Sequence, residues 1–140
     1  MAPAYVDSSA VLKLAIHEPE TAALEAFLAG CEGLVSSRLS VLECRRAASR
    51  APHVRLLQTI DDVLDAIYLL EITPAILEDA AKTDPPLLRS LDAIHLATAL
   101  SIGDAQVEVI TYDQRFADAA RASGLTVVQP GRSSADSQLT

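Results

Sequence analysis

The chain has 140 residues, a length that suits one domain with a hydrophobic core of its own. Half of the residues are hydrophobic and only 4% are aromatic, a composition that favours helices over an all-β core. The formal charge of −8 argues against a protein that holds nucleic acid through bulk positive charge, although an enzyme that neutralises phosphate locally stays possible.

Cysteine usage and the N-terminal stretch indicate an intracellular protein. Cys31 and Cys44 are the only cysteines and form no CxxC pair, so we expect reduced thiols and no zinc site built from them. Asp7 and Lys13 interrupt the first apolar stretch, and no basic residue precedes it, unlike a secretory signal. No apolar run approaches the length of a membrane span. We therefore expect a cytoplasmic protein with no membrane partner.

Short apolar runs alternate with segments of helical periodicity along the chain. Strands are expected at 4–6, 33–36, 67–72, 107–111 and 125–128, and helices between Ser9 and Pro19, at 20–28, 39–50 and 54–65, from Pro74, and at 90–102 and 114–122, with a loop at 84–86. Pro74 is expected to open its helix at the first turn, and Gly103 to end the helix before it. Strands that alternate with helices predict one α/β domain on a parallel sheet.

Four acidic residues stand out because of where they fall in this pattern. Asp7 and Asp113 each follow an apolar strand, and the carboxyl ends of parallel strands share one edge, where α/β proteins place their sites. Asp92 falls in the first turn of a helix, and Glu43 lies on the apolar stripe of another. A lone carboxylate on such a stripe needs an exposed position or a partner, such as a metal ion.

Capping is a common alternative role for an Asp at these junctions. Taken singly, Asp7, Asp92 or Asp113 could be no more than a helix N-cap that accepts hydrogen bonds from free backbone amides. Four carboxylates together would repel one another, and such a cluster makes sense only with a cation. Mg²⁺ and Mn²⁺ prefer oxygen ligands, polarise a scissile phosphate and activate water. As a set, the four acids therefore point to metal-dependent phosphodiester chemistry.

The chain resembles a known nuclease family in four places. The runs YVDSSAVLKL, SSRLSVLEC, LRSLDAIHLATAL and VITYDQRFADAA are similar to the four acidic motifs of PIN-domain nucleases, and more narrowly to those of VapC-type toxins of bacterial toxin–antitoxin pairs. The resemblance spans roughly residues 4 to 128. LDAIHLATA and the strand-Thr-x-Asp segment are the most specific parts, and the four motifs occur in the family's order.

The resemblance implies an activity and a set of catalytic residues. Asp7, Glu43, Asp92 and Asp113 match the family's acidic positions, which catalyse Mg²⁺- or Mn²⁺-dependent hydrolysis of RNA. Asp7 and Asp92 would be direct metal ligands, and Asp113 would bind a second ion or act through a bound water. Glu43 would orient the nucleophilic water. Many relatives carry a further Asp or Asn shortly after the fourth acid. Gln114 follows the fourth acid here, so the sequence does not identify the ligands of a complete second metal site.

The same resemblance implies a fold and partners. The fold would be a PIN-like three-layer α/β/α sandwich with a central, mainly parallel sheet over residues 1–129, followed by a polar, disordered tail at 130–140. The partners would be a structured RNA such as transfer or ribosomal RNA, a cognate VapB-type antitoxin, and a second copy of the chain in a homodimer.

Other residues near the four acids are candidates for supporting roles. Ser9 and Thr111 could hydrogen-bond a carboxylate, or could serve only the local backbone. His95 lies one helical turn after Asp92, on the same face of the helix; it could touch the site, but we favour the interpretation that it packs the helix. The only dense basic stretch is a candidate for RNA phosphate contacts, with a solvated helix face as the alternative: Arg45, Arg46 and Arg50.

Three other functions fit part of the pattern. A haloacid-type hydrolase would need a second Asp two positions after the first, where Ser9 stands. A response-regulator receiver would need a Lys after a late strand, and the last Lys of the chain is Lys82. A non-catalytic PIN-like module that binds RNA or protein is the remaining alternative, and such a module is expected to lack some of the four acids.

Overall fold

The computed structural model describes residues 2–51, 55–83 and 88–132. The strands are β1 (Ala4–Val6), β2 (Leu34–Ser37), β3 (Tyr68–Leu70), β4 (Glu108–Ile110) and β5 (Thr126–Val128). The helices are α1 (Ser8–Ala15), α2 (Thr21–Ala29), α3 (Leu39–Arg50), α4 (Leu56–Asp65), α5 (Pro74–Ala81), α6 (Ser90–Ser101) and α7 (Gln114–Ala122). The loop expected at 84–86 and the tail beyond Arg132 lie outside the described residues.

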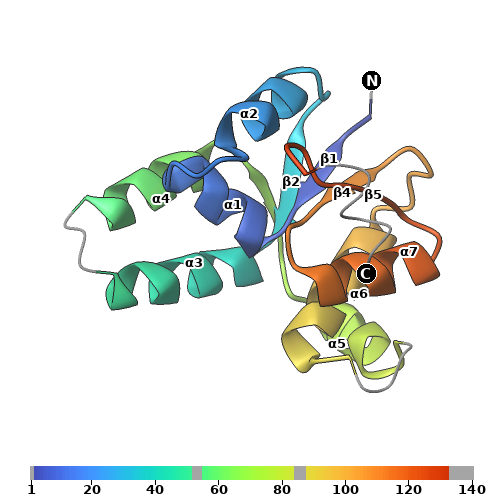
Figure 1. Cartoon of the computed structure of the whole chain (residues 1–140). Helices are drawn as coiled ribbons and strands as arrows, with labels where there is room; N and C mark the ends of the chain where they lie inside the picture. Colours follow the sequence, from blue (N-terminus) through green and yellow to red (C-terminus); the bar gives the residue numbers. More distant parts are fainter. Residues whose placement is uncertain (1, 52–54, 84–87, 133–140) are drawn as a thin grey trace.

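β1 is the central strand of a five-stranded sheet with the order β3-β2-β1-β4-β5 (Figure 1). Every neighbouring pair is parallel, and β1 pairs with β2 on one side and with β4 on the other. The chain thus runs outward from β1 to β3 and then crosses to β4 on the other side. In parallel sheets such a reversal opens a crevice at the carboxyl ends of the strands.

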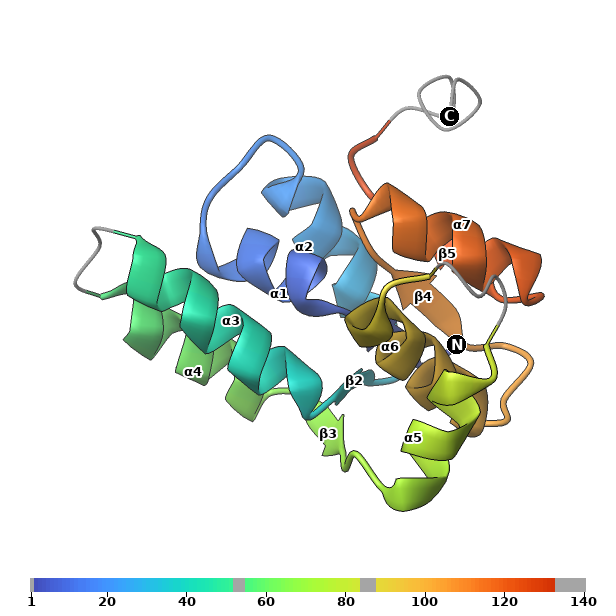
Figure 2. The ribbon, with the colours of Figure 1, turned by 90° about the horizontal axis from the view of Figure 1, so that it is seen from below.

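Helices cover both faces of this sheet (Figures 1 and 2). One core lies under α1, α2, α3 and α4, and the other under α6 and α7, while α5 packs on α6. Side chains of a strand alternate between faces, so Ala4 and Val6 enter the first core and Tyr5 enters the second. The predicted α/β/α sandwich with a parallel sheet is therefore confirmed.

The helix limits follow from local chemistry. Thr73 caps α5 by accepting a hydrogen bond from the Ile76 amide, and Pro74 occupies the first turn as expected. Gly103 follows α6 with φ of 69°, a conformation that glycine adopts at little cost. β3 is shorter than the predicted strand at 67–72. No helix of the described segments is long and apolar enough to cross a membrane.

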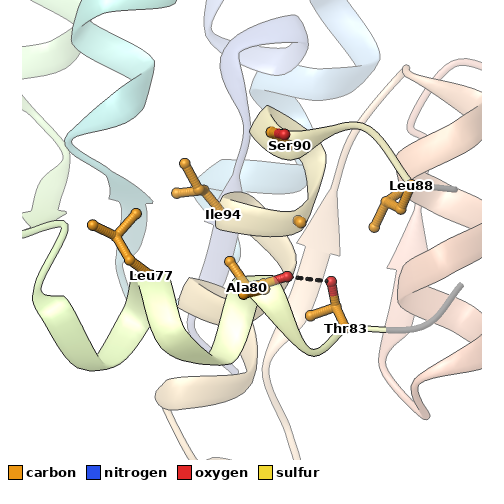
Figure 3. A pocket seen from close by; sticks show the side chains of 8 residues that line it. Leu77, Ala80, Thr83, Leu88, Ser90 and Ile94 are labelled. Atoms are coloured by element: carbon orange, nitrogen blue, oxygen red, sulfur yellow. Dashed lines mark hydrogen bonds between the residues drawn. The ribbon is translucent and has the colours of Figure 1, made fainter. Parts of the chain in front are cut away.

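A groove of about 340 Å³ lies between α5 and α6 (Figure 3). Its lining includes Leu77, Ala80, Thr83, Leu88, Ser90 and Ile94. Helical spacing places Ser90 and Ile94 on one side of α6, whereas Asp92 and His95 project from the other side. The groove is therefore separate from the acidic residues.

The segment that follows β5 contacts the domain. The Tyr112 hydroxyl donates a hydrogen bond to the Pro130 carbonyl at 2.7 Å, and the Arg132 guanidinium lies 5.2 Å from the centre of the Tyr112 ring. The Gln129 side chain donates to the Thr111 carbonyl at 2.9 Å. Of the tail predicted from Pro130 onward, the first three residues thus lie close to the folded domain.

Candidate active site

The carboxyl ends of the neighbouring strands β1 and β4 bring two of the predicted acids to one edge of the sheet. Asp7 follows β1 directly, and Asp113 lies three residues after the end of the neighbouring β4. Each residue is also the N-cap of the helix that follows, α1 or α7. The capping role and the shared edge are therefore both present, because a strand-to-helix junction creates them together.

Asp7 is a buried carboxylate held by three donors. Its Oδ1 accepts hydrogen bonds from the Ser9 hydroxyl at 2.6 Å and the Ala10 amide at 3.1 Å, and its Oδ2 accepts from the Thr111 hydroxyl at 2.5 Å. Burial raises the pKa of Asp7, while the nearby His95 and these hydrogen bonds oppose the rise. Ser9 and Thr111 thus have the contacts expected of supporting residues.

Asp113 is exposed and is tied to Asp7 through one hydroxyl. Its Oδ1 accepts from the Arg115 amide at 2.9 Å and the Phe116 amide at 3.3 Å. Its own amide donates to the Thr111 Oγ1 at 3.0 Å, and the Thr111 hydroxyl donates in turn to Asp7. This arrangement fixes the backbone of Asp113 relative to the buried carboxylate.

Asp92 lies within the first turn of α6 and is not its N-cap, which is Arg89. Partial burial raises the pKa of Asp92, and the negative charges of Asp113, Glu43 and Asp7 raise it further, while His95 opposes the rise. Capping therefore does not explain this residue. Asp92 thus lies within electrostatic range of the other three acids.

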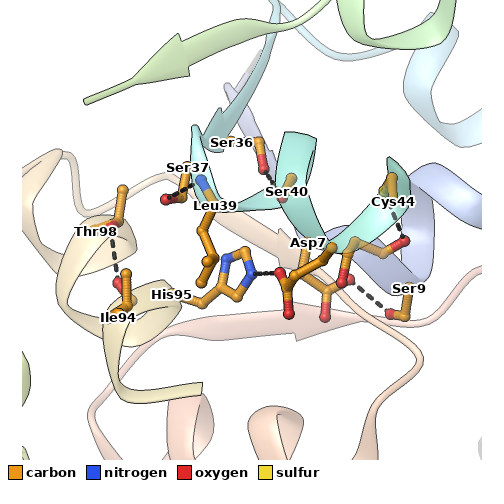
Figure 4. A network of polar contacts seen from close by, with 12 residues as sticks. Asp7, Ser9, Ser36, Ser37, Leu39, Ser40, Cys44, Ile94, His95 and Thr98 are labelled. Atoms are coloured by element: carbon orange, nitrogen blue, oxygen red, sulfur yellow. Dashed lines mark hydrogen bonds and ion pairs between the residues drawn. The ribbon is translucent and has the colours of Figure 1, made fainter. Parts of the chain in front are cut away.

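Glu43 meets α6 through His95. Its Oε1 lies 2.6 Å from the His95 Nε2, and the His95 Nδ1 lies 2.7 Å from the Tyr5 hydroxyl. His95 is 3% exposed, and in Figure 4 it lies beside Asp7. The interpretation of His95 as a packing residue was therefore incomplete, because it also contacts a predicted catalytic acid. The position of His95 one turn after Asp92 was the available signal.

The carboxylates are of the chemical type that binds a hard cation, although their arrangement in the described residues does not form a metal-binding group. Carboxylate oxygens are the ligands that Mg²⁺ and Mn²⁺ prefer, and burial at Asp7 leaves a charge that a cation would compensate. Within residues 2–51, 55–83 and 88–132, no group of three or more His, Cys, Asp or Glu is placed to hold a metal ion. Metal ligation by Asp7, Asp92 and Asp113 therefore stays a prediction.

The arginines of α3 divide into two groups. Arg45 pairs with Asp61 of α4, with 3.2 Å between Nε and Oδ1. Arg46 and Arg50 are exposed and lie about one and two turns after Glu43, on the same side of α3. Arg46 and Arg50 are thus better placed than Arg45 to extend a surface that begins at the acids.

Comparison with known proteins identifies the family. The model of the PIN domain family matches residues 4–122. Ribonuclease VapC46 of Mycobacterium tuberculosis is 40% identical over 136 residues, which cover 93% of this chain and 99% of that protein. The chain belongs to the VapC family of PIN-domain proteins. Ribonuclease VapC35 of the same species is 39% identical to this VapC-family chain. The match covers 91% of this chain and 97% of VapC35.

Solved structures give the same family fold. A toxin–antitoxin complex from Klebsiella pneumoniae matches this VapC-family chain with a TM-score of 0.69 and 25% identity, over 91% of this chain and 97% of that one. VapC20 of Mycobacterium tuberculosis, described as a toxin that cleaves the sarcin–ricin loop, has a TM-score of 0.69 at 18% identity. It covers 91% of this chain and 99% of its own, and at that identity the likeness concerns the fold alone.

Proposed function

We propose that this VapC-family protein is a Mg²⁺- or Mn²⁺-dependent endoribonuclease that acts as the toxin of a toxin–antitoxin pair. The observation that carries the proposal is the Thr111 hydroxyl, which links Asp7 to the backbone of Asp113 at the carboxyl ends of β1 and β4. Asp92 lies within electrostatic range of Asp7, Glu43 and Asp113. These positions match the four acidic motifs of the family. The names of the ribonuclease relatives support the reaction class.

The proposed roles follow from burial and hydrogen bonding. Asp7, Asp92 and Asp113 would hold the cation, which when bound would supply positive charge for the scissile phosphate and would lower the pKa of a water. Ser9 and Thr111 keep Asp7 in one rotamer, since their hydroxyls donate to different carboxylate oxygens. Glu43, which is anchored to α6 by His95, would orient the nucleophilic water.

The test is digestion of a structured RNA by the purified protein. With Mg²⁺ or Mn²⁺ we expect new RNA ends at a small number of positions, and with a chelator we expect intact RNA. RNA that is bound but never cut under any cation would support the alternative, a non-catalytic PIN-like module that binds RNA or protein.

Arg46 and Arg50 are proposed to bind RNA phosphates on the surface beside Glu43. Replacing both with Ala should raise KM and change kcat little. The slope of log affinity against log salt should also fall, by about 0.7 for each phosphate of a single-stranded region that is no longer neutralised. Binding titrations at several salt concentrations measure this slope. Arg121→Ala is the matched control, because Arg121 is exposed in the last turn of α7, where it pairs with Asp118 and with none of the four acids of the proposed site. An equal change in the control would contradict the assignment.

Two protein partners are proposed, a VapB-type antitoxin and a second copy of this chain. A solved neighbour described as a toxin–antitoxin complex supports the first. Exposed leucines on α5 and α6, Leu77 at 49% and Leu91 at 48%, offer apolar surface for the second. Light scattering on the chain alone and after co-expression with a candidate antitoxin would give the mass of each assembly. A monomer in both samples would contradict both partners.

A further inference from the structure

Tyr5, His95 and Glu43 form a continuous hydrogen-bonded row from the second core to the acidic edge. The Tyr5 hydroxyl lies 2.7 Å from the His95 Nδ1, and the His95 Nε2 lies 2.6 Å from the Glu43 Oε1. Tyr5 is 0% exposed and His95 is 3% exposed, whereas the Glu43 side chain is 22% exposed. The row therefore begins in the protein interior and ends at a carboxylate that solvent reaches.

The two hydrogen bonds of the row are compatible with one continuous donor direction, from Tyr5 through His95 to Glu43. An ordinary phenol hydroxyl is protonated at neutral pH, because its usual pKa is about 10. A protonated phenol can donate to Nδ1, which then accepts through its lone pair, and the ring proton resides on Nε2. Nε2–H donates to Glu43, whose carboxylate can only accept.

We propose that Tyr5 is a positioning residue, which holds His95 in the Nε2–H tautomer and through it fixes the Glu43 carboxylate for the reaction. The inference rests on the proposed nuclease function, since Glu43 is the group that the row would position. Neither Tyr5 nor His95 touches substrate in this scheme. Both act only through Glu43.

Packing alone does not account for the Tyr5 hydroxyl. The His95 ring centre lies 6.0 Å from that of Tyr5 and 5.8 Å from that of Phe116, so aromatic rings border the imidazole on two sides. A Phe at position 5 would keep this packing. A buried hydroxyl costs free energy unless it is hydrogen-bonded, and the hydrogen bond to His95 helps to offset this cost.

The first test observes the tautomer directly, without any RNA. Nitrogen-15 NMR of the His95 ring should show a proton on Nε2 and none on Nδ1 in the wild type, with the signals assigned by their loss in His95→Gln. In Tyr5→Phe the Nδ1 signal should shift, because its donor is gone. Tyr68→Phe is the matched control, since Tyr68 is 70% exposed. A doubly protonated ring in the wild type, or an unmoved Nδ1 in Tyr5→Phe, would overturn the proposal.

The second test separates positioning from packing by kinetics. Tyr5→Phe should lower kcat by roughly 3- to 10-fold with little change in KM, because one hydrogen bond is removed. His95→Gln should keep part of the activity that His95→Leu loses, since a Gln amide can donate to Glu43 without help from Tyr5. The double variant Tyr5→Phe/His95→Gln should then have the same kcat as His95→Gln alone.

The outcomes distinguish this proposal from the proposed function. If Tyr5→Phe lowers kcat by the same factor in the wild type and in His95→Gln, the hydroxyl contributes to stability alone, and the positioning role is overturned. If the wild-type protein cuts no RNA with any cation, the nuclease function fails, while the NMR measurement still tests whether Tyr5 sets the tautomer of His95.

Discussion

The Asp7→Asn and Asp92→Asn variants are expected to lose RNA cleavage by at least about 100-fold, because a missing ligand removes several kcal/mol of transition-state charge stabilisation. The substitution keeps the shape of the side chain and removes its charge. Burial raises the pKa of both residues, and neighbouring acids raise that of Asp92 further, so removing the charge relieves the cost of burial at both positions and repulsion at Asp92 in metal-free buffer. We therefore expect an unfolding temperature equal to or above that of the wild type. Initial cleavage rates and thermal melts measure the two effects.

Asp79→Asn is the control for this prediction. Asp79 is exposed on α5, so the same chemical change should leave cleavage and the unfolding temperature unchanged. A highly purified Asp92→Asn protein that cuts RNA at the wild-type rate would remove Asp92 from the proposed site. A variant that is inactive because it is unfolded would show nothing about catalysis. The unfolding temperature is therefore measured for each variant whose cleavage rate is measured.

Mn²⁺ or Mg²⁺ is expected to raise the unfolding temperature of the wild-type protein, because a ligand that binds only the native state stabilises it. At ten times the dissociation constant the gain is about 1.4 kcal/mol, which corresponds to roughly 3–6 °C for a domain of this size. The Asp7→Asn variant should show little of this shift. An unchanged melting temperature, together with cleavage that survives a chelator, would contradict the metal mechanism.

The cation effect should depend on pH with a definite sign. The folded-state pKa values of Asp7 and Asp92 are raised above their ordinary values. The native protein therefore binds protons more tightly than the unfolded chain. As pH rises from the ordinary pKa of an Asp through the raised folded-state pKa, these two groups lower the free energy of unfolding of the metal-free protein. Protons and cations compete for the same carboxylates, so the shift caused by Mn²⁺ should be larger at neutral than at mildly acidic pH. Melts in both buffers, with and without Mn²⁺, measure the difference.

The sequence predicts well those parts of the site that local rules control. Asp7 could be placed because an apolar strand followed by an Asp leads to the carboxyl edge of a parallel sheet. Ser9 and Thr111 could be named as supporting residues because both lie close to an acid along the chain, and both hydrogen-bond to Asp7. The parallel sheet followed from the alternation of short apolar strands with helices.

Contacts between distant segments could not be derived in the same way. Glu43 and His95 are 52 residues apart, and His95 and Tyr5 are 90 apart. Which side of α3 approaches which side of α6 depends on how both helices pack across the sheet, and one sequence carries no local signal for that. The apolar stripe around Glu43 did indicate that this carboxylate needs either an exposed position or a partner, but not that an imidazole is the partner.

The alternation of side chains along β1 makes the length of this strand unusually critical. In three residues it sends Ala4 and Val6 to one core and Tyr5 to the other, and then delivers Asp7. Deleting or inserting a single residue here would reverse every side chain. The phenol would then enter the core under α1, away from its imidazole partner, and the caps of α1 would be misaligned. Engineered variants should therefore change the identity of a β1 residue before they change the number of residues in the strand.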